Sequence, residues 1–208
     1  MDLSQPISTV IPSAHGPVLS VLAGTNEPLT GRTIASLTTP PVSQSQTSSV
    51  LAHLTASGLV HMTNAGSARL YTLNRDHLAA PAVEQLATLR SRLWDRMVEH
   101  ATGWARRPDV LAVYGSTARG DRHLGSDIDI LLVRPTGVEA SDPAWTSGLT
   151  DFANAVVSWT GNEVELLDRS HSDLAAMAAA GESLLDNIRH DGRFLIGSRS
   201  MVPTSVAA

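Results

Sequence analysis

Two aspartates, Asp127 and Asp129, stand two residues apart within residues 126–133, where acids alternate with aliphatic residues before an apolar run. This pattern predicts a β-strand, in which alternate residues face the same side about 6.6 Å apart along the chain. Two carboxylates that face one spot repel each other unless a cation offsets their charge. Mg²⁺ prefers such hard oxygen ligands, and substrate phosphates commonly complete its coordination. The spacing therefore predicts a divalent-metal site that receives a triphosphate.

A glycine-rich turn precedes the aspartates and predicts a second part of the same site. Residues 109–114 predict a buried strand that runs directly into Gly115 and Ser116, and Arg119 follows one helical turn later. Glycine allows the backbone to approach a ligand closely, the serine supplies a hydroxyl, and the N-terminus of a following helix presents amides to anions. The arginine is placed to neutralise charge on a leaving pyrophosphate. The turn therefore predicts a phosphate-binding segment.

The segments 115–120 and 126–133 together resemble the "GSxARG…SDIDLLV" signature of minimal nucleotidyltransferases of the DNA polymerase β-like superfamily. The resemblance covers about residues 105–197. It implies that the glycine–serine turn holds a nucleoside triphosphate and that the two aspartates bind Mg²⁺. The family places a third carboxylate on a later strand, and Glu165 takes that place here, where many members have aspartate. Glu163 shares the same predicted strand face and is the alternative third acid.

This resemblance also implies a reaction. An acceptor hydroxyl attacks the α-phosphate of a nucleoside triphosphate, here expected to be ATP, while two Mg²⁺ ions hold the attacking and leaving oxygens. Members of the superfamily modify partner proteins in toxin–antitoxin pairs, aminoglycosides or RNA ends. Because the chain ends soon after its last predicted strand, without an appended helical domain, we expect a separate, toxin-like protein acceptor. An alternative stays open, in which the domain only senses nucleotide for a DNA-binding transcription regulator.

The N-terminal part of the chain predicts three short helices followed by a β-hairpin, with Thr30 and Ser43 as helix N-caps. Residues 51–60 resemble the end of the third helix in MarR-like and ArsR-like winged helix-turn-helix regulators, and this resemblance covers about residues 17–78. It implies binding of double-stranded DNA. The third helix contains no Arg or Lys, so a docking or homodimerisation module is the alternative. The candidate DNA contacts are Gln44, Gln46, Thr47 and the wing residue Arg69.

The composition excludes several classes of site. None of the 208 residues is cysteine, which excludes disulfides, thiolate zinc sites and cysteine nucleophiles. The net charge of −5 gives no general argument for polyanion binding. The N-terminus lacks the features of a signal peptide, and no apolar run reaches the ~20 residues of a membrane helix, so we expect a cytoplasmic protein without membrane contact.

These patterns predict an α/β (α+β) chain: a winged helix-turn-helix, a linking helix, and a mixed-sheet nucleotidyltransferase fold. The predicted segments are a disordered arm (1–16), the winged helix-turn-helix (17–80), the linking helix (81–104), the nucleotidyltransferase domain (105–199) and a disordered tail (200–208).

Overall fold

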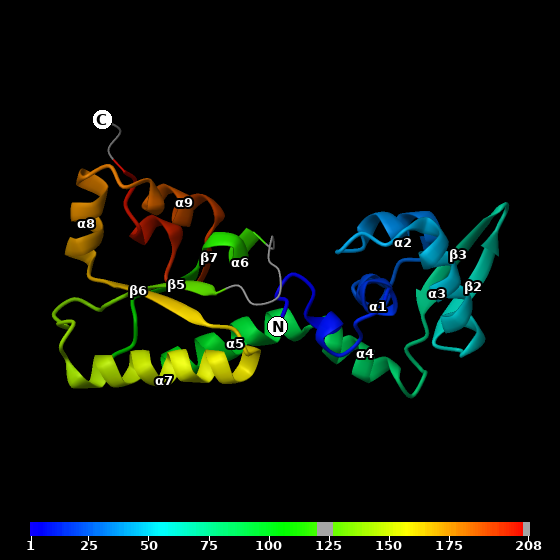
Figure 1. Ribbon diagram of the computed structural model, residues 1–208, viewed down its shortest axis with the longest axis horizontal. Coiled ribbons are helices and arrows are strands. Elements are labelled where there is room, and N and C mark those ends of the chain that lie inside the picture. Colours follow the sequence, from blue (N-terminus) through cyan, green and yellow to red (C-terminus); the bar gives the residue numbers. More distant parts are fainter. Residues whose placement is uncertain (120–126, 206–208) are drawn as a thin grey trace. The chain divides into compact units, whose positions relative to one another are not determined.

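The computed structural model describes residues 1–119 and 127–205, apart from the side chain of Arg119. The chain divides into two compact units (Figure 1). The N-terminal unit contains Asp2–Ser91, and the C-terminal unit contains Met1 together with Arg92–Ala208. Both units combine helices with a small sheet, which confirms the predicted mixture of α and β elements.

In the N-terminal unit, the three α-helices α1, α2 and α3 precede a hairpin, as predicted. The two predicted caps are confirmed, since Thr30 Oγ1 accepts from the Thr33 amide and Ser43 forms a capping box with Gln46. Its sheet is antiparallel in the order β1-β3-β2. The elements of this unit are η1 (Pro6–Thr9), α1 (His15–Ala23), β1 (Leu29–Thr30), α2 (Gly31–Leu37), α3 (Gln44–Ala56), β2 (Val60–Ala65), β3 (Ala68–Leu73) and α4 (Ala80–Ala87).

Both predicted disordered ends are folded over their described residues, so these two predictions are wrong. In the segment 1–16, Leu3 and Ile7 are fully buried, and Ile7 belongs to the core formed by α1, α2 and α3. In the segment 200–208, Val202 is fully buried, and Ser205 donates two hydrogen bonds to the Asp186 carboxylate. Residues 206–208 lie outside the described residues. Isolated apolar residues gave no periodic signal, although tertiary packing buries them.

The predicted single linking helix, residues 81–104, is also wrong, because the structure has two helices there. Helix α4 ends at Ala87, and α5 (Leu89–Thr102) follows. Between them, Thr88 Oγ1 donates to the Glu84 carbonyl, the type of side-chain bond that competes with regular helix. The boundary between the two units falls inside α5.

The C-terminal unit is built on a mixed four-stranded sheet, as predicted, in the order β6-β5-β4-β7. The pairs β4/β5 and β4/β7 are antiparallel, whereas β5/β6 is parallel. The elements of this unit, after α5, are β4 (Val110–Val113), α6 (Gly115–Arg119), β5 (Ile128–Val133), α7 (Pro143–Thr160), β6 (Val164–Arg169), α8 (His171–Ala179), α9 (Ser183–Asp191), β7 (Arg193–Ile196) and η2 (Arg199–Met201).

Helices cover both faces of this sheet. Helix α7 lies along one face with α5, and α8 and α9 lie on the other (Figure 1). Strand β4 is fully buried, as expected for a strand that is covered on both faces and reads as a continuous apolar run. The parallel pair needs a crossover, and α7 supplies it. Within the described ranges, none of the helices is long and apolar enough to cross a membrane.

Candidate active site

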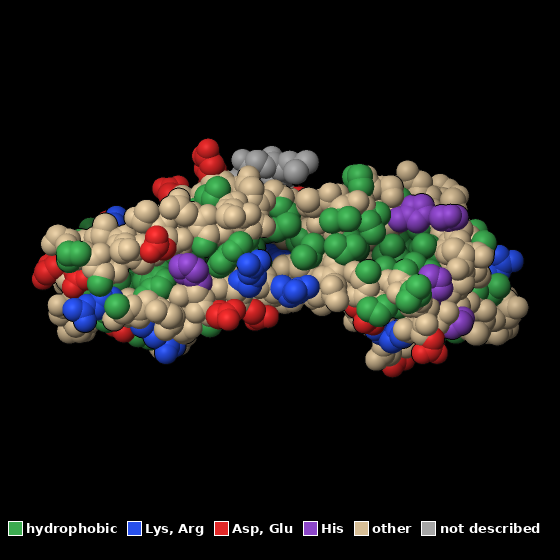
Figure 2. Space-filling view, turned by 90° about the horizontal axis from the view of Figure 1, so that it is seen from below, with side chains coloured by type: hydrophobic (Ala, Val, Ile, Leu, Met, Phe, Trp, Pro, Cys, Tyr) green, Lys and Arg blue, Asp and Glu red, His purple; other side chains and the backbone are tan. Residues whose placement is uncertain are grey.

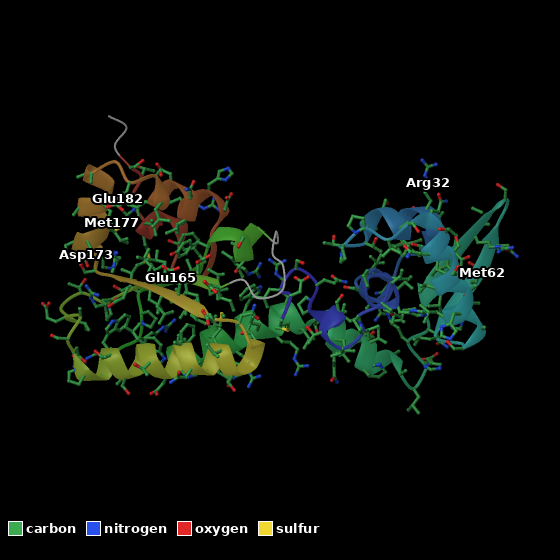
Figure 3. The ribbon with its side chains drawn as sticks, viewed as in Figure 1. Arg32, Met62, Glu165, Asp173, Met177 and Glu182 are labelled. Atoms are coloured by element: carbon green, nitrogen blue, oxygen red, sulfur yellow. The ribbon has the colours of Figure 1, made fainter. Side chains whose placement is uncertain are left out.

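The parallel pair of strands brings two of the predicted acids together. Asp129 on β5 and Glu165 on β6 are register partners, so their side chains leave the same face of the sheet from adjacent strands. Figure 3 shows Glu165 on β6. Asp127 precedes β5 by one residue and is exposed, and the buried Ile128 separates it from Asp129. The register therefore gives Asp129 and Glu165 a common face, whereas Asp127 lies one residue before the strand.

The predicted turn lies directly against this face. Gly115 has a φ of +66°, and a Cβ built on it would collide with Asp129 Oδ2. The Tyr114 amide, one residue earlier, donates to the Asp129 carbonyl at 3.0 Å. Glycine is required here for two reasons, because its conformation is left-handed and because the carboxylate occupies the space of a side chain. The turn and the acid therefore form one compact arrangement.

Tyr114 belongs to the same site, although no sequence pattern indicated a role for it beyond its place before Gly115. Burial is the largest cause that raises the pKa of its hydroxyl to about 12, and the negative charges of Asp129 and Glu165 contribute to this rise. Arg169 acts in the opposite direction. The phenol consequently stays protonated at neutral pH and lies within electrostatic reach of both acids.

The acids suit a hard divalent cation by their donor chemistry. Asp129 and Glu165 offer carboxylate oxygens from adjacent strands, and the exposed Asp127, one residue before β5, is the third predicted acid. Within the part of the chain that the structure describes, no three His, Cys, Asp or Glu side chains already form a group that could hold a metal ion. Side-chain rotation is therefore required before the three acids could share an ion.

The structure describes the side chain of one of the two remaining predicted phosphate-binding residues, Ser116 and Arg119. Ser116 follows Gly115 in α6 and is partly exposed. The backbone of Arg119 ends α6, but its side chain lies outside the described residues. Ser126, part of the sequence signature, also lies outside them.

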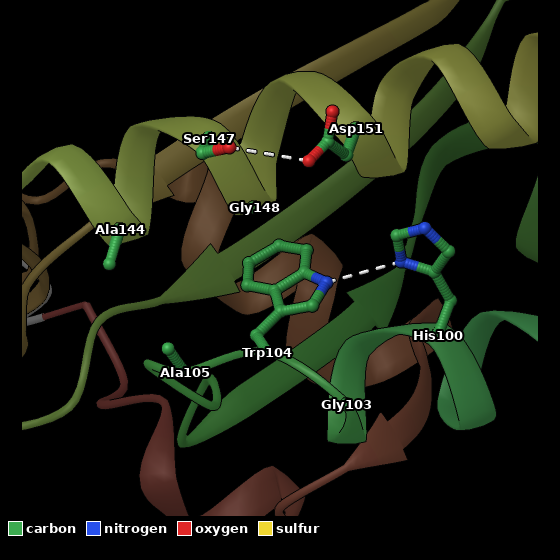
Figure 4. Close-up of a pocket in the computed structure, with 8 residues that line it drawn as sticks. All are labelled: His100, Gly103, Trp104, Ala105, Ala144, Ser147, Gly148 and Asp151. Atoms are coloured by element: carbon green, nitrogen blue, oxygen red, sulfur yellow. Dashed lines mark hydrogen bonds between the residues drawn. The ribbon is translucent and has the colours of Figure 1, made fainter.

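A cavity of about 460 Å³ lies elsewhere in this unit, between the end of α5 and α7 (Figure 4). The Trp104 indole N–H donates to His100 Nδ1 at 3.1 Å, and a Cβ on Gly148 would come within 2.8 Å of the Trp104 ring. Ser147 and Asp151 on α7 line its other side. The cavity contains none of the predicted acids, so it is not part of the candidate active site.

A second polar cavity, of about 620 Å³, lies at the carboxyl ends of β5 and β6. Arg134 forms ion pairs there with Asp168 at 2.7 Å and with Asp173 at 3.0 Å. Figure 3 shows Asp173 and Met177 on α8 beside this region. Because the arginine is buried and already has two acidic partners, we interpret this network as a structural link between β5, β6 and α8.

The candidate DNA contacts in the N-terminal unit differ in their exposure to solvent. Gln44, Gln46 and Arg69 are exposed, but Thr47 is fully buried, so the prediction that Thr47 contacts DNA is wrong. Thr47 lies on the same helical face as Val50, three residues later, and this face packs into the core. Gln46 is tied to the helix start, since its Oε1 accepts from the Ser43 backbone and hydroxyl.

A groove of about 740 Å³ lies in this unit between α2, α3 and the hairpin. Arg32 and Arg69 line it together with Gln44, and its lining contains no acidic residue. Figure 3 shows Arg32 on α2 and Met62 on β2. The groove is therefore positively charged, with a partly apolar lining that includes Met62 and Tyr71.

Comparison with curated proteins found no match. Among solved structures, a crystal structure of a toxin–antitoxin with AMP-PNP is 19% identical over 51% of this chain and 75% of its own, with a TM-score of 0.37. A mutant of the toxin–antitoxin MntA–HpeT is 16% identical over 51% and 75%, also with a TM-score of 0.37. TrmBL2, an archaeal chromatin protein, is 14% identical over 89% and 78%, with a TM-score of 0.32. These values are too low to assign an activity.

One protein-family model, described as a nucleotidyltransferase domain, matches residues 92–185. This segment is slightly less than half of the chain, and it contains Gly115, Asp129 and Glu165. The in-register acids and the glycine turn therefore lie within the segment that this nucleotidyltransferase model matches.

Proposed function

We propose that the C-terminal unit is a Mg²⁺-dependent nucleotidyltransferase that transfers AMP from ATP to an acceptor hydroxyl. The observation that carries this proposal is the register pairing of Asp129 with Glu165, with the Gly115 backbone directly against the Asp129 carboxylate. The matched family supports a transferase. Asp127, Asp129 and Glu165 are the proposed metal-binding residues, and two Mg²⁺ ions would offset charge on the attacking and leaving oxygens.

The proposed reaction is a displacement at phosphorus. The acceptor oxygen forms a bond to the α-phosphorus, the bond from that phosphorus to the bridging oxygen breaks, and pyrophosphate leaves. Glu165, the exposed acid on β6, is the proposed recipient of the acceptor proton. Gly115 and Ser116 hold the triphosphate, and Arg119 neutralises charge on pyrophosphate. Tyr114 stays neutral beside the acids, and we propose that it positions their carboxylates.

The proposed acceptor is a hydroxyl of a separate partner protein, as for the toxin of a toxin–antitoxin pair. Glu165 supports an acceptor of this size, because it is exposed and lies on β6, the edge strand of the sheet. A macromolecular hydroxyl could approach an exposed acid on an edge strand without crossing another strand.

The test is transfer of label from ATP labelled at the α-phosphate, with the purified full chain, Mg²⁺ and extract from the source cells. We expect labelled protein with the wild type and none with the double variant Asp127→Asn/Asp129→Asn. Asp151→Asn, which removes an exposed acid on α7, is the matched control and should retain transfer. Label that persists in the double variant would contradict the metal assignment.

A second candidate function is DNA binding by the N-terminal unit, with the C-terminal unit acting as a nucleotide sensor. The groove that contains Arg32 and Arg69 without any acidic lining residue favours it, because cations in such a groove can neutralise DNA phosphates. The proposed base contact is Gln44, which also lines the groove, with Gln46 as a further exposed residue of the same helix end.

Gel-shift titrations on the DNA upstream of the protein's own gene test this second function. Arg69→Ala and Arg32→Ala should each weaken binding and reduce its salt dependence, because each removes one phosphate contact. Arg75→Ala is the control, since Arg75 is already paired with Glu84 outside the groove. Equal binding by all three variants would show that the groove does not contact DNA.

A further inference from the structure

Two imidazoles meet on the surface of the N-terminal unit. His15 opens α1 and His53 lies in the last turn of α3, and His15 Nε2 is 3.1 Å from His53 Nδ1. The rings are nearly perpendicular, at 84°, with centroids 5.2 Å apart. His53 is exposed and His15 is partly exposed, so solvent and ions reach the pair. Figure 2 shows adjacent histidine side chains on the surface of this unit.

The separation of the two nitrogens is close to that of two imidazole ligands on one metal ion. Zn–N bonds of 2.0–2.1 Å at a tetrahedral angle place the two nitrogens about 3.3 Å apart. The observed 3.1 Å needs only a few tenths of an ångström of opening. A metal bound to both nitrogens would lie to one side of the line between them, so it would replace their hydrogen bond after a small rotation of the two rings.

The surroundings of the pair also fit this use. His15 Nδ1 lies 3.3 Å from Ser13 Oγ, which can accept a hydrogen bond from Nδ1–H. In that tautomer Nε2 carries the lone pair that binds a metal. Such an outer partner is the usual way in which a protein fixes the tautomer of a metal-binding histidine. In the described structure no third His, Cys, Asp or Glu joins the pair, so water would complete the coordination.

We propose that His15 and His53 form a binding site for a divalent transition metal of the Zn²⁺ class, which links α1 to α3. Imidazole nitrogen is a preferred ligand of Zn²⁺, whereas Mg²⁺ prefers the oxygen donors of the C-terminal acids. The site is therefore chemically distinct from the proposed nucleotidyltransferase centre and does not depend on it. A metal that binds only the folded state stabilises the N-terminal unit by mass action.

The experiment is calorimetric titration of Zn²⁺ into the metal-free full chain, with Mg²⁺ in excess to occupy the acidic site. Thermal unfolding with and without Zn²⁺ is measured in parallel. We expect one Zn²⁺ per chain, with binding at least about tenfold weaker in His15→Ala and in His53→Ala. His61→Ala, which removes an exposed histidine of β2, is the matched control and should bind as the wild type does.

Circular dichroism without metal shows whether each variant is folded. If His15→Ala does not fold, His53→Ala decides, because the His53 side chain is exposed and its removal leaves the core intact. The proposal is overturned if the wild type binds no Zn²⁺. It is equally overturned if the folded His53→Ala variant binds Zn²⁺ as tightly as the wild type, or if His61→Ala loses binding to the same extent.

Discussion

The two units place their candidate contact residues by different geometry. In the C-terminal unit, Asp129 and Glu165 lie on neighbouring strands whose register fixes both position and face. In the N-terminal unit, the candidate DNA contacts lie on one helix and on a hairpin. Each residue along a helix turns by about 100°, so an error of one position moves a side chain from the surface to the core. Thr47 is such a case, whereas alternation in a strand tolerates uncertainty in the strand ends.

Apart from the loss of transfer expected of the double aspartate variant, the largest effect should come from replacing Gly115. Gly115→Ala introduces a Cβ into the space of the Asp129 carboxylate, and we expect a loss of nucleotidyl transfer of about 100-fold, as for a reacting group that is displaced by about 1 Å. The measurement is the initial rate of transfer of label from ATP. The folded fraction is checked by thermal unfolding.

Gly66 in the N-terminal hairpin is the matched glycine. Its φ is +61°, close to that of Gly115, but a Cβ there would meet nothing within 4 Å. Gly66→Ala shares only the conformational cost of a left-handed residue, about 1–2 kcal/mol, and should leave transfer unchanged. If both variants lost activity equally, the close approach at Asp129 would have no special role.

A smaller effect is expected from replacing Thr47, the buried residue of the N-terminal unit that was predicted to contact DNA. Its Oγ1 is buried and has no hydrogen-bond partner among the described residues. Thr47→Val keeps the shape and removes the unpaired hydroxyl, which should raise the free energy of unfolding by about 1 kcal/mol. Denaturant unfolding measures this gain. DNA binding, if present, should not change, and a lost gel shift would restore Thr47 as a contact.

The N-caps of α3 and α7 differ in charge, so their contributions to stability should differ in pH dependence. Ser43→Ala removes a neutral cap from α3 and should lower the free energy of unfolding by about 1 kcal/mol at any pH.

Asp142 caps α7 with a carboxylate whose pKa is lowered, chiefly by the hydrogen bond from the Trp145 amide. Because the folded pKa lies below the unfolded value near 3.8, its contribution is present above that value and is lost as pH falls through the folded pKa. Urea unfolding of Asp142→Asn between neutral and acidic pH should therefore show a difference from wild type that disappears in acid.

The smallest expected effect is a titration shift at Tyr114. The chain has two tyrosines, so Tyr71→Phe leaves Tyr114 as the single group with a tyrosinate absorbance signal. In this background, Asp129→Asn/Glu165→Gln should lower the Tyr114 pKa from about 12, because two negative charges are removed. The pKa should stay above 10.0, since burial is the larger cause. An unchanged titration would mean that the acids do not face the phenol.

Most elements could be predicted because their signals are local. Caps at Thr30 and Ser43 and the apolar run of β4 depend on a few neighbouring residues, and the structure has them. Strand β1 was missed because it has only two residues, Leu29 and Thr30, and exists by pairing with β3 far along the chain. The break at Thr88 was missed because helical apolar spacing continues across it.

The candidate site likewise combines features with local sequence signals and features that depend on long-range pairing. Strand alternation predicted that Asp127 and Asp129 share a face, which stays a prediction because β5 begins at Ile128, and the family resemblance pointed to Glu165. Its exact pairing with Asp129 needs a strand register that only tertiary structure provides. The effect of Asp129 and Glu165 on Tyr114 and the contact between His15 and His53 also depend on tertiary structure, because these residues are separated in the sequence.

The crossover through α7 has a consequence for the order of folding. Asp129 and Glu165 become neighbours only when α7 has packed and β6 has paired in parallel with β5, since the whole helix separates them in sequence. Parallel pairing of distant segments forms slowly compared with local helices and hairpins, because the chain must close a long loop first. The capacity to bind a metal and a nucleotide should therefore be acquired late, after most of the unit's secondary structure has formed.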